Sequence, residues 1–396
     1  MSANSIKEIL AKRAAAKLPA ASNAASKFLD TPAIDSISEV YNSTDMTNSF
    51  LDEETSAIPI TLVTLEEGEI DPRLKLLSHS SRTLLHKCPR KYQLYRMSAN
   101  KISLAEEKEQ EQGVTFAYGS AVGVGVQSAL ERKSEDQVIM DTFLEWDVDL
   151  LHETPRQAKS FWLAIRAVQK IMAMLENGFL DDYELVYYQG KPAVELSFSI
   201  ALPNDFKYRG FVDAVLKHKG TGEVLVLENK TSSGTAQPAA FKNSGQALGY
   251  SVILDKLFPN LSSYEVLYIV YETKSMEFVE LPFKKSLLQR ALWLQELLID
   301  TQLITMYDSY KTYPMHGEAC FDFFRDCEYL GICTLSTENI VKPLTTEVVA
   351  RIEADDDKYD FLIDFYDLVA SQVSKAEQGE YEGILNNQAK ELKGGI

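Results

Sequence analysis

The feature that most constrains this chain is a block of strand-type sequence near its middle. Four segments, "AVELSFSIAL", "KYRGFVDAVLKHK", "EVLVLENKTSS" and "YEVLYIVYET", alternate apolar and polar residues and are separated by turn residues. A helix-type segment, "AAFKNSGQALGYSVILDKLF", lies between the third and the fourth. Long helix-type segments precede and follow the block, at residues 155–179 and 284–304. This order predicts an α/β core in which a central mixed sheet is flanked by helices.

Length and charge limit the classes of protein. The chain has 396 residues, of which 45% are hydrophobic, so it can bury a large core. This length suggests either one large domain with additions or two domains. A formal net charge of −18 means that nucleic-acid binding would need a local basic patch. We see no membrane-spanning apolar run and no secretory signal, and four cysteines do not form a disulfide scaffold. We therefore expect a cytoplasmic protein, of a bacterium or a phage-infected cell.

The chain divides into three regions. Residues 1–73 are small, polar and acidic, which predicts a mostly disordered tail with one short helix at "SIKEILAKRAAAKL". Residues 74–338 contain the strand block and form the main domain. Residues 339–396 read as a helical extension with acidic interruptions.

Charged residues gather where two neighbouring strands end. Asp213 lies on one predicted strand, and Glu228 and Lys230 lie on the next, after the turn "KGTGE". Residues 228 and 230 share a face because strand side chains repeat every two residues, and a hairpin would bring Asp213 beside them. Two carboxylates and the backbone carbonyl of Asn229 suit Mg²⁺ or Mn²⁺, with Lys230 placed to act on a water or on developing charge. The simpler alternative is an ordinary salt bridge at a strand end.

Three further segments accompany this constellation. "QALGY" places Gln246 and Tyr250 four residues apart, on one face of a helix. "GVGVQSALE" and "LSHSSRTLLHKCPRKYQLY" lie upstream, in helix-type sequence. With the carboxylate–lysine set, they make the chain resemble the PD-(D/E)xK nucleases, in particular the RecB-like, CRISPR-associated exonuclease branch. The resemblance covers roughly residues 77–333 and implies a restriction-endonuclease-like core with Asp213, Glu228, Lys230, Gln246 and Tyr250 as catalytic residues.

One position departs from that family. Its helix usually reads G-x-x-x-H-x-x-L-E, with the His helping to hold a metal ion. This chain has Gln127 there, and amide oxygen is a poorer ligand than imidazole or carboxylate. Glu131, one turn further on, is either a substitute ligand or a structural bystander.

The four cysteines stand as one early residue and three late ones: Cys88, Cys320, Cys327 and Cys333. The resemblance implies that they hold a 4Fe–4S cluster tying the N-terminal and C-terminal helical parts together. The interval between Cys320 and Cys327 is wider than the usual C-x-x-C of the family. Buried inert thiols and a zinc site are the alternatives, although the close pairs that zinc prefers are absent.

The resemblance implies DNA, as single strands or ends, as the substrate. The segment "CPRKYQLYR" offers Arg90, Lys91, Tyr92 and Arg96 for phosphate contact and base stacking, and Arg209 and Lys242 lie near the motifs. The alternative interpretation of this segment is a helix that packs against the core and exposes a solvated basic face.

We therefore expect a Mg²⁺- or Mn²⁺-dependent exonuclease of DNA repair, recombination, or phage or CRISPR DNA processing. A helicase or recombination partner would be a separate chain, because no P-loop is present. A nuclease fold that binds DNA or assembles without cleaving it is one alternative. An unrelated α/β protein with a zinc site is another.

Overall fold

A computed structural model describes residues 61–97, 106–146, 159–258, 264–322, 325–354 and 359–375. The short helix predicted near the start of the chain lies outside these residues. Residues 61–73, which the sequence placed at the end of a disordered tail, include described structure: Ile70 is buried, and Asp71 caps the helical turn η1 (Pro72–Lys75). The described structure therefore includes residues ahead of the boundary expected at Leu74.

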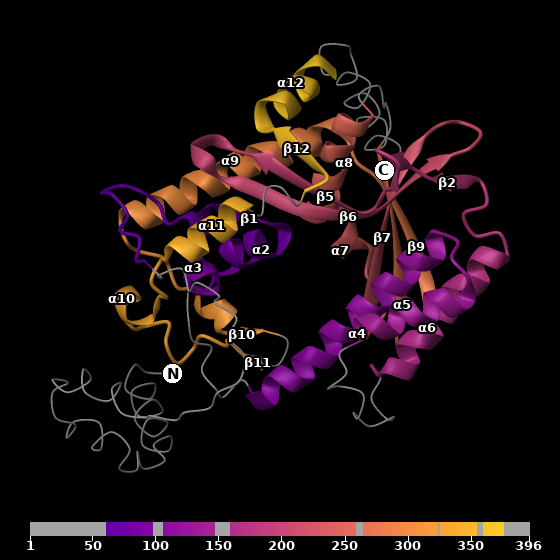
Figure 1. The fold of residues 1–396 in the computed structure, drawn as a ribbon, viewed down its shortest axis with the longest axis horizontal. Coiled ribbons are helices and arrows are strands. Elements are labelled where there is room, and N and C mark those ends of the chain that lie inside the picture. Colours follow the sequence, from indigo (N-terminus) through magenta and orange to yellow (C-terminus); the bar gives the residue numbers. More distant parts are fainter. Residues whose placement is uncertain are drawn as a thin grey trace, which may run out of the picture. The chain divides into compact units, whose positions relative to one another are not determined.

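The core of the fold is a mixed sheet, as predicted (Figure 1). Its strands follow the order β12-β5-β6-β7-β8-β9, with β1 and β2 also paired to β6. The β5–β6, β6–β7 and β8–β9 pairs are antiparallel, whereas β7–β8 and β12–β5 are parallel. The bounds are β1 (Leu76–Leu77), β2 (Tyr183–Leu185), β5 (Val194–Ala201), β6 (Lys207–His218), β7 (Val224–Ser232), β8 (Glu265–Glu272), β9 (Glu277–Lys284) and β12 (Phe361–Asp364).

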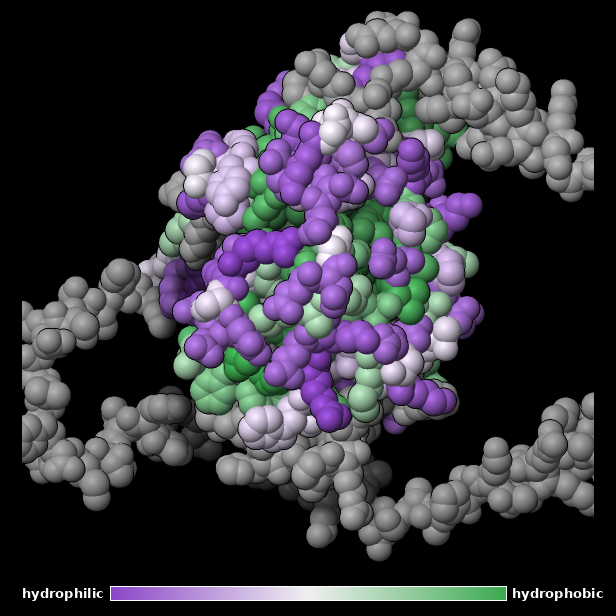
Figure 2. All heavy atoms as spheres, turned by 90° about the vertical axis from the view of Figure 1, so that its right-hand side faces the viewer, coloured by the Kyte–Doolittle hydropathy of each residue, from purple (hydrophilic) through white to green (hydrophobic). Residues whose placement is uncertain are grey.

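Helices cover both faces of this sheet. On one face α4 (Glu106–Leu130), α5 (Glu135–Glu145) and α6 (Phe161–Glu176) pack over alternate residues such as Leu225, Leu227 and Ile269. On the other face α8 (Gly245–Leu257) and α9 (Leu287–Ser309) pack over Val226, Tyr268 and their neighbours. The strand alternation in the sequence thus separates two apolar layers, because successive strand side chains point to opposite faces. Figure 2, seen from the side of α6 and β9, shows hydrophilic side chains interspersed with hydrophobic ones.

A close contact between α8 and α9 fixes the position of α8. A Cβ added at Gly249 would lie 2.7 Å from the buried ring of Trp293, so only glycine allows this approach. Gly249 stands next to Tyr250, within the Q-x-x-x-Y motif. The packing of the two helices therefore determines where that motif lies relative to the sheet.

The remaining elements are shorter. Helices α2 (His79–Lys87) and α3 (Pro89–Met97) lie side by side with the cysteine-bearing segment. The other elements are β3 (Tyr187–Tyr188), β4 (Lys191–Pro192), η4 (Pro203–Asp205), α7 (Pro238–Lys242), η5 (Gly317–Cys320), β10 (Phe321–Asp322), β11 (Arg325–Asp326), α10 (Thr337–Ile340) and α11 (Thr346–Ala354). Among the described residues, no helix is both long enough and apolar enough to cross a membrane.

The C-terminal region differs from the predicted helical extension. Strand β12 joins the edge of the central sheet beside β5, and the Asp360 carboxylate accepts hydrogen bonds of 2.9 and 2.8 Å from the Ser197 backbone N–H and hydroxyl. Helix α12 (Phe365–Lys375) then packs against α8 and α9. Residues 359–375 therefore complete the main fold. A four-residue strand whose partner lies far away in sequence leaves little local signal.

Candidate active site

The β6–β7 hairpin forms as predicted and brings the two carboxylates together. The paired residues Val215–Val226 and Ala214–Leu227 lead directly to Asp213 and Glu228, at the next step along the two strands. The Asn229 backbone N–H donates a hydrogen bond of 3.0 Å to Asp213 Oδ2. Asp213 is therefore fixed against the neighbouring strand, facing the Glu228 carboxyl group.

Lys230 connects the hairpin to α8. Its ammonium forms an ion pair with Glu228 and donates a hydrogen bond of 3.1 Å to Gln246 Oε1. The Gln246 amide donates in turn to the Tyr250 hydroxyl over 2.6 Å. The shared helix face predicted for Gln246 and Tyr250 is confirmed, and the pair holds Lys230 at the edge of the carboxylates.

Burial and mutual repulsion shift the pKa values of these groups. Burial, followed by the charge of Asp213, raises the pKa of Glu228 to about 8. Burial also raises the pKa of Asp213, although Lys230 and the Asn229 N–H oppose the shift. Burial by itself would lower the pKa of Lys230, but the charges of Glu228 and Asp213 outweigh it and raise that pKa. Two carboxyl groups therefore compete for one lysine charge.

The site has the oxygen ligands that a hard cation prefers. The Glu228 side chain is fully buried, and no hydrogen-bond donor reaches either of its oxygens with suitable geometry, although the Lys230 ammonium lies beside it. The side-chain oxygen of Asn229 is also buried without a donor. Buried, unsatisfied carboxylate oxygens are costly unless a cation or a proton compensates them. Across the described residues, however, no three His, Cys, Asp or Glu side chains converge at metal-ligating distance.

Glu195 is a site residue that the sequence analysis missed. It stands on β5, opposite Asp213 in the register set by the pairs Val194–Ala214 and Leu196–Val212. The Gln127 amide of α4 donates a hydrogen bond to its carboxylate. Burial and the charge of Asp213 raise the pKa of Glu195, which shows that the two carboxylates interact. The ordinary strand pattern of "AVELSFSIAL" gave no signal that Glu195 lies beside Asp213.

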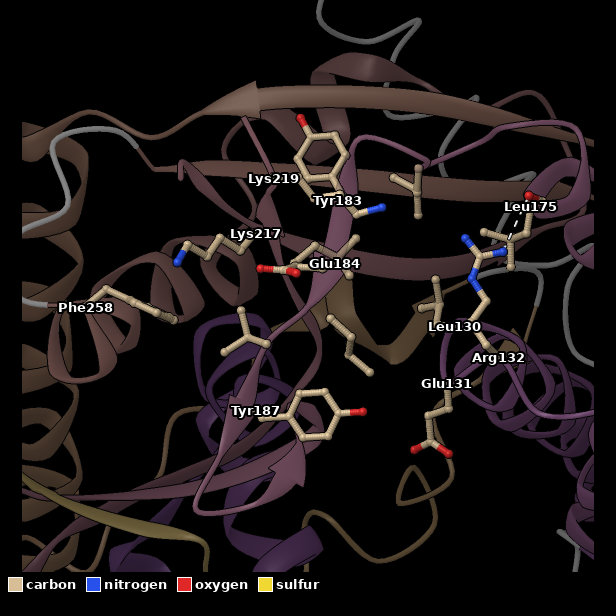
Figure 3. A pocket seen from close by; sticks show the side chains of 14 residues that line it. Leu130, Glu131, Arg132, Leu175, Tyr183, Glu184, Tyr187, Lys217, Lys219 and Phe258 are labelled. Atoms are coloured by element: carbon tan, nitrogen blue, oxygen red, sulfur yellow. Dashed lines mark hydrogen bonds between the residues drawn. The ribbon is translucent and has the colours of Figure 1, made fainter. Parts of the chain in front are cut away.

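Glu131, the candidate substitute ligand from the sequence, is directed elsewhere. Its carboxylate pairs with Lys133 at 2.8 Å. It lines a cavity of about 620 Å³ with Arg132, Tyr183 and Lys217, and this lining includes neither Asp213 nor Glu228 (Figure 3). We assign the active site from the carboxylate chemistry rather than from this larger volume. Glu131 therefore lies just past the end of α4, away from the lining shared by the two carboxylates.

A second cavity opens beside the carboxylates. It measures about 430 Å³ and is lined by Asp213, Gln246, Tyr250, His79 and Arg209, among others. His79, which the sequence analysis did not single out, has its pKa lowered to about 4 by burial and by the positive charges of Lys230 and Arg82. A neutral imidazole therefore lines this cavity at neutral pH.

The basic segment of α3 proves to be largely structural. Arg90 is buried and donates hydrogen bonds to the carbonyl oxygens of Cys333 (3.0 Å) and Leu335 (2.8 Å). Tyr92 is fully buried, and its hydroxyl donates to the Leu74 carbonyl over 2.7 Å. Both side chains are thus buried and bonded within the protein in this structure, and their contact with DNA stays a prediction.

The other predicted DNA contacts have different surroundings. Arg96 and Arg209 line the cavity beside Asp213, although both also bond to backbone carbonyls, of Arg73 and Ile352. Lys91 lies 3.7 Å from Glu328 in an ion pair, and Lys242 is exposed at the end of α7. The structure thus leaves Arg96 and Arg209 nearest to the carboxylates.

The four cysteines come from the two ends of the main domain. Cys88 lies between α2 and α3, and these helices bond to the late segment through the Arg90 N–H to the Pro314 carbonyl, at 3.0 Å. Burial, then the nearby thiols of Cys320 and Cys327, and more weakly Cys88, raise the pKa of Cys333. All four thiols are free and interact electrostatically, but they do not form a ligating group in this structure.

Comparison with known families gives a match over the main domain. The model of the PD-(D/E)XK nuclease superfamily matches residues 76–334, which span the site, the flanking helices and all four cysteines. The chain belongs to the PD-(D/E)XK nuclease superfamily. The resemblance noted in the sequence therefore holds at superfamily level.

More specific relatives are distant. A crystal structure of a candidate exonuclease from Eubacterium rectale shares 12% identity and covers 65% of this chain and 91% of its own, with a TM-score of 0.39. The crystal structure of SSO0001 shares 13% identity and covers 59% of this chain and 96% of its own, with a TM-score of 0.24. No curated protein matches the sequence.

Proposed function

We propose that this protein is a Mg²⁺- or Mn²⁺-dependent nuclease that hydrolyses phosphodiester bonds in DNA, acting as an exonuclease of the RecB-like branch. One observation carries the proposal: Asp213, Glu228 and Lys230 meet at the end of the β6–β7 hairpin, and the Glu228 carboxylate is fully buried with Lys230 as its close cation. Membership of a nuclease superfamily supports phosphodiester hydrolysis as the reaction. DNA repair, recombination, and phage or CRISPR DNA processing are settings that suit such an activity.

Each residue of the constellation has a role in this account. Asp213, Glu228 and the Asn229 carbonyl would hold the divalent ion, with Gln127 the earlier candidate for a further ligand. A bound Mg²⁺ or Mn²⁺ supplies an activated water and charge stabilisation at the phosphate. Lys230 directs its ammonium toward the same place and stabilises the charge that develops there.

Gln246 and Tyr250 act through Lys230. Gln246 accepts the hydrogen bond from Lys230 and donates to Tyr250, so the lysine has one fixed direction. A fixed donor contributes more to catalysis than a mobile one because no reorganisation is needed in the transition state. The cavity beside Asp213 adds Arg96 and Arg209, whose guanidinium charges suit a phosphate backbone.

We also propose that the cysteines hold a 4Fe–4S cluster. Its support is the donor set: four free thiols, from both ends of the domain, interact with one another around Cys333. Cluster ligation by four thiolates would link α2 and α3 to the late segment, where Arg90 already bonds to the Cys333 and Leu335 carbonyls. Iron and sulfide analysis of anaerobically purified protein tests this part separately from cleavage.

The function is tested with DNA labelled at the 5′ or the 3′ end, single-stranded and double-stranded, with Mg²⁺, Mn²⁺ or EDTA. The proposal expects metal-dependent release of short products from an end. DNA binding without cleavage under either metal would instead favour a nuclease fold that has lost catalysis. A helicase or recombination partner, if one is required, would appear as activity restored by that separate protein.

A further inference from the structure

Glu195 occupies an unusual backbone conformation inside a strand. Its φ is +49°, in the left-handed region that residues other than glycine, asparagine and aspartate rarely adopt. Such a conformation costs about 1–3 kcal/mol and persists where the surroundings require it, which is often at functional sites. Glu195 is the second residue of β5 (Val194–Ala201), and the residues on either side of it pair with β6.

The same position interrupts the alternation of both strands. Val194 and Leu196 are two residues apart, yet Val194 packs with the α4–α6 layer and Leu196 lies in the α8–α9 layer. On β6, Val212 and Ala214 are likewise divided between the two layers. In a regular strand, residues two apart share a face. Glu195 and Asp213 therefore stand opposite each other at a shared break in the sheet.

At this break, Glu195 joins Asp213 and Glu228 in a row of three carboxylates across neighbouring strands. Glu195 on β5 is opposite Asp213 on β6, and Asp213 is opposite Glu228 on β7, by continuation of the two registers. Directly opposed residues on antiparallel strands have Cβ atoms about 4.5–5.5 Å apart. Three acidic side chains in such a row repel one another, and the described residues around them supply one close lysine, Lys230.

A second observation concerns the oxygens of the buried carboxylate. The Glu228 carboxylate is fully buried in the middle of the site; its Oε1 pairs with Lys230, whereas its Oε2 has no donor within hydrogen-bond geometry. Glu195 is more exposed at the other end of the row, and its carboxylate is held by the Gln127 amide. A side chain that is partly exposed and held by one neutral hydrogen bond can turn toward an ion without breaking the core.

The three carboxylates do not converge at ligating distance among the described residues. We infer that the Glu195 side chain turns toward the divalent cation when it binds and acts as a third carboxylate ligand beside Asp213 and Glu228. Gln127 acts as a positioning residue, since its amide holds the Glu195 carboxylate beside the row while no ion is bound. This inference rests on the proposed metal-dependent function. The competing account is that the Gln127–Glu195 bond serves only to join α4 to β5.

The test is Mn²⁺ binding to the full chain, measured without DNA by electron paramagnetic resonance of free Mn²⁺ and by calorimetry. Glu195→Gln keeps the size of the side chain and a hydrogen-bonding partner for Gln127, while removing the charge. We expect Mn²⁺ affinity to fall at least about tenfold, because ligand charge sets the affinity of such sites. Glu131→Gln, at the acidic residue paired with Lys133, is the matched control and should bind as the unmodified chain does.

Thermal unfolding without metal, measured beside Mn²⁺ affinity, separates the two accounts. A structural contact alone predicts that Glu195→Gln and Gln127→Ala lower the unfolding temperature and leave Mn²⁺ affinity unchanged, and this result would overturn the inference. If the unmodified chain itself binds no Mn²⁺, the metal-dependent function fails, and Glu195 as a ligand fails with it. Binding that is lost in Asp213→Asn but kept in Glu195→Gln overturns the inference alone.

Discussion

Lys230 on β7 donates a hydrogen bond of 3.1 Å to Gln246 on α8, and this bond joins the carboxylate hairpin to the helix beside it. Lys230 also pairs with the buried Glu228, so its ammonium is held from two sides. The position of α8 depends on the contact of Gly249 with Trp293. The direction of the lysine is therefore set by core packing as well as by the site itself.

Removing the Gln246 side chain tests this arrangement. In Gln246→Ala, Lys230 keeps its charge and loses its hydrogen-bond acceptor, so we expect DNA cleavage to fall about 10- to 100-fold, since small misplacements of catalytic groups have effects of this order. The measurement is single-turnover cleavage of end-labelled DNA. Gln302→Ala, on the exposed side of α9, is the control and should cleave normally. Equal rates for both variants would mean that Gln246 does not position Lys230.

A buried charge cluster attaches α12 to the fold. Asp255 is 4% exposed and accepts hydrogen bonds from Arg290, Gln372 and Lys375, the last over 2.8 Å. Asp255→Asn would leave two buried cations without their partner, and we expect it to lower the free energy of unfolding by about 3–5 kcal/mol.

Urea denaturation measures this change. Asp367→Asn removes an exposed carboxylate on α12 that lies 3.3 Å from Lys256 on α8, and it should lower the free energy of unfolding by less than about 1 kcal/mol. A similar, small loss in both variants would show that α12 is held by apolar contacts instead.

His86 gives the stability a defined pH dependence. Its ring nitrogen lies 2.7 Å from the Asp300 carboxylate, and this hydrogen bond raises the pKa of His86, against a smaller opposing effect of burial. A raised folded-state pKa means that the stabilisation is complete below the unfolded-state value and is lost as pH rises through the folded-state value. Because the His86 side chain is about half exposed, we expect its pairing with Asp300 to contribute less than about 1 kcal/mol to the free energy of unfolding.

The comparison is between the unmodified chain and His86→Asn, unfolded by urea at a series of pH values from below 6 to 9. The unmodified chain should be the more stable of the two at low pH, and the difference should shrink as pH rises. A difference that grows with pH would contradict the assignment of the ion pair to protonated His86.

The proposed cluster predicts a colour and a metal content. Anaerobically purified protein should be brown and contain several irons and sulfides per chain, and Cys327→Ser should lose them. Thr334→Ala, an exposed change beside Cys333, should retain both. Colourless protein that contains zinc would instead favour the zinc alternative, and protein without either metal would favour inert thiols.

Local patterns predicted the centre of the fold well. The turn between Lys217 and Val224 and the two-residue periodicity around it were enough to predict the β6–β7 hairpin, because both signals are local. The spacing of Gln246 and Tyr250 likewise determined their shared helix face. These are the parts of the site in which neighbours in sequence are neighbours in space.

Contacts between distant residues were not predictable in the same way. Glu195 belongs to the site because of a break in alternation on β5, which no pattern in "AVELSFSIAL" reveals. Strand β12 pairs with β5 across a long separation in sequence. Arg90 looked like a phosphate contact because a sequence shows charge and not the carbonyl oxygens that satisfy it.

The most direct test of the central claim is Mg²⁺-dependent cleavage of end-labelled DNA by the unmodified chain, Lys230→Ala and Lys274→Ala. Lys274 is an exposed lysine in the β8–β9 turn, so its removal matches the charge change away from the site. We predict cleavage that EDTA abolishes, that Lys274→Ala retains, and that Lys230→Ala reduces about 100-fold or more. Cleavage by Lys230→Ala at the rate of the unmodified chain would contradict the account.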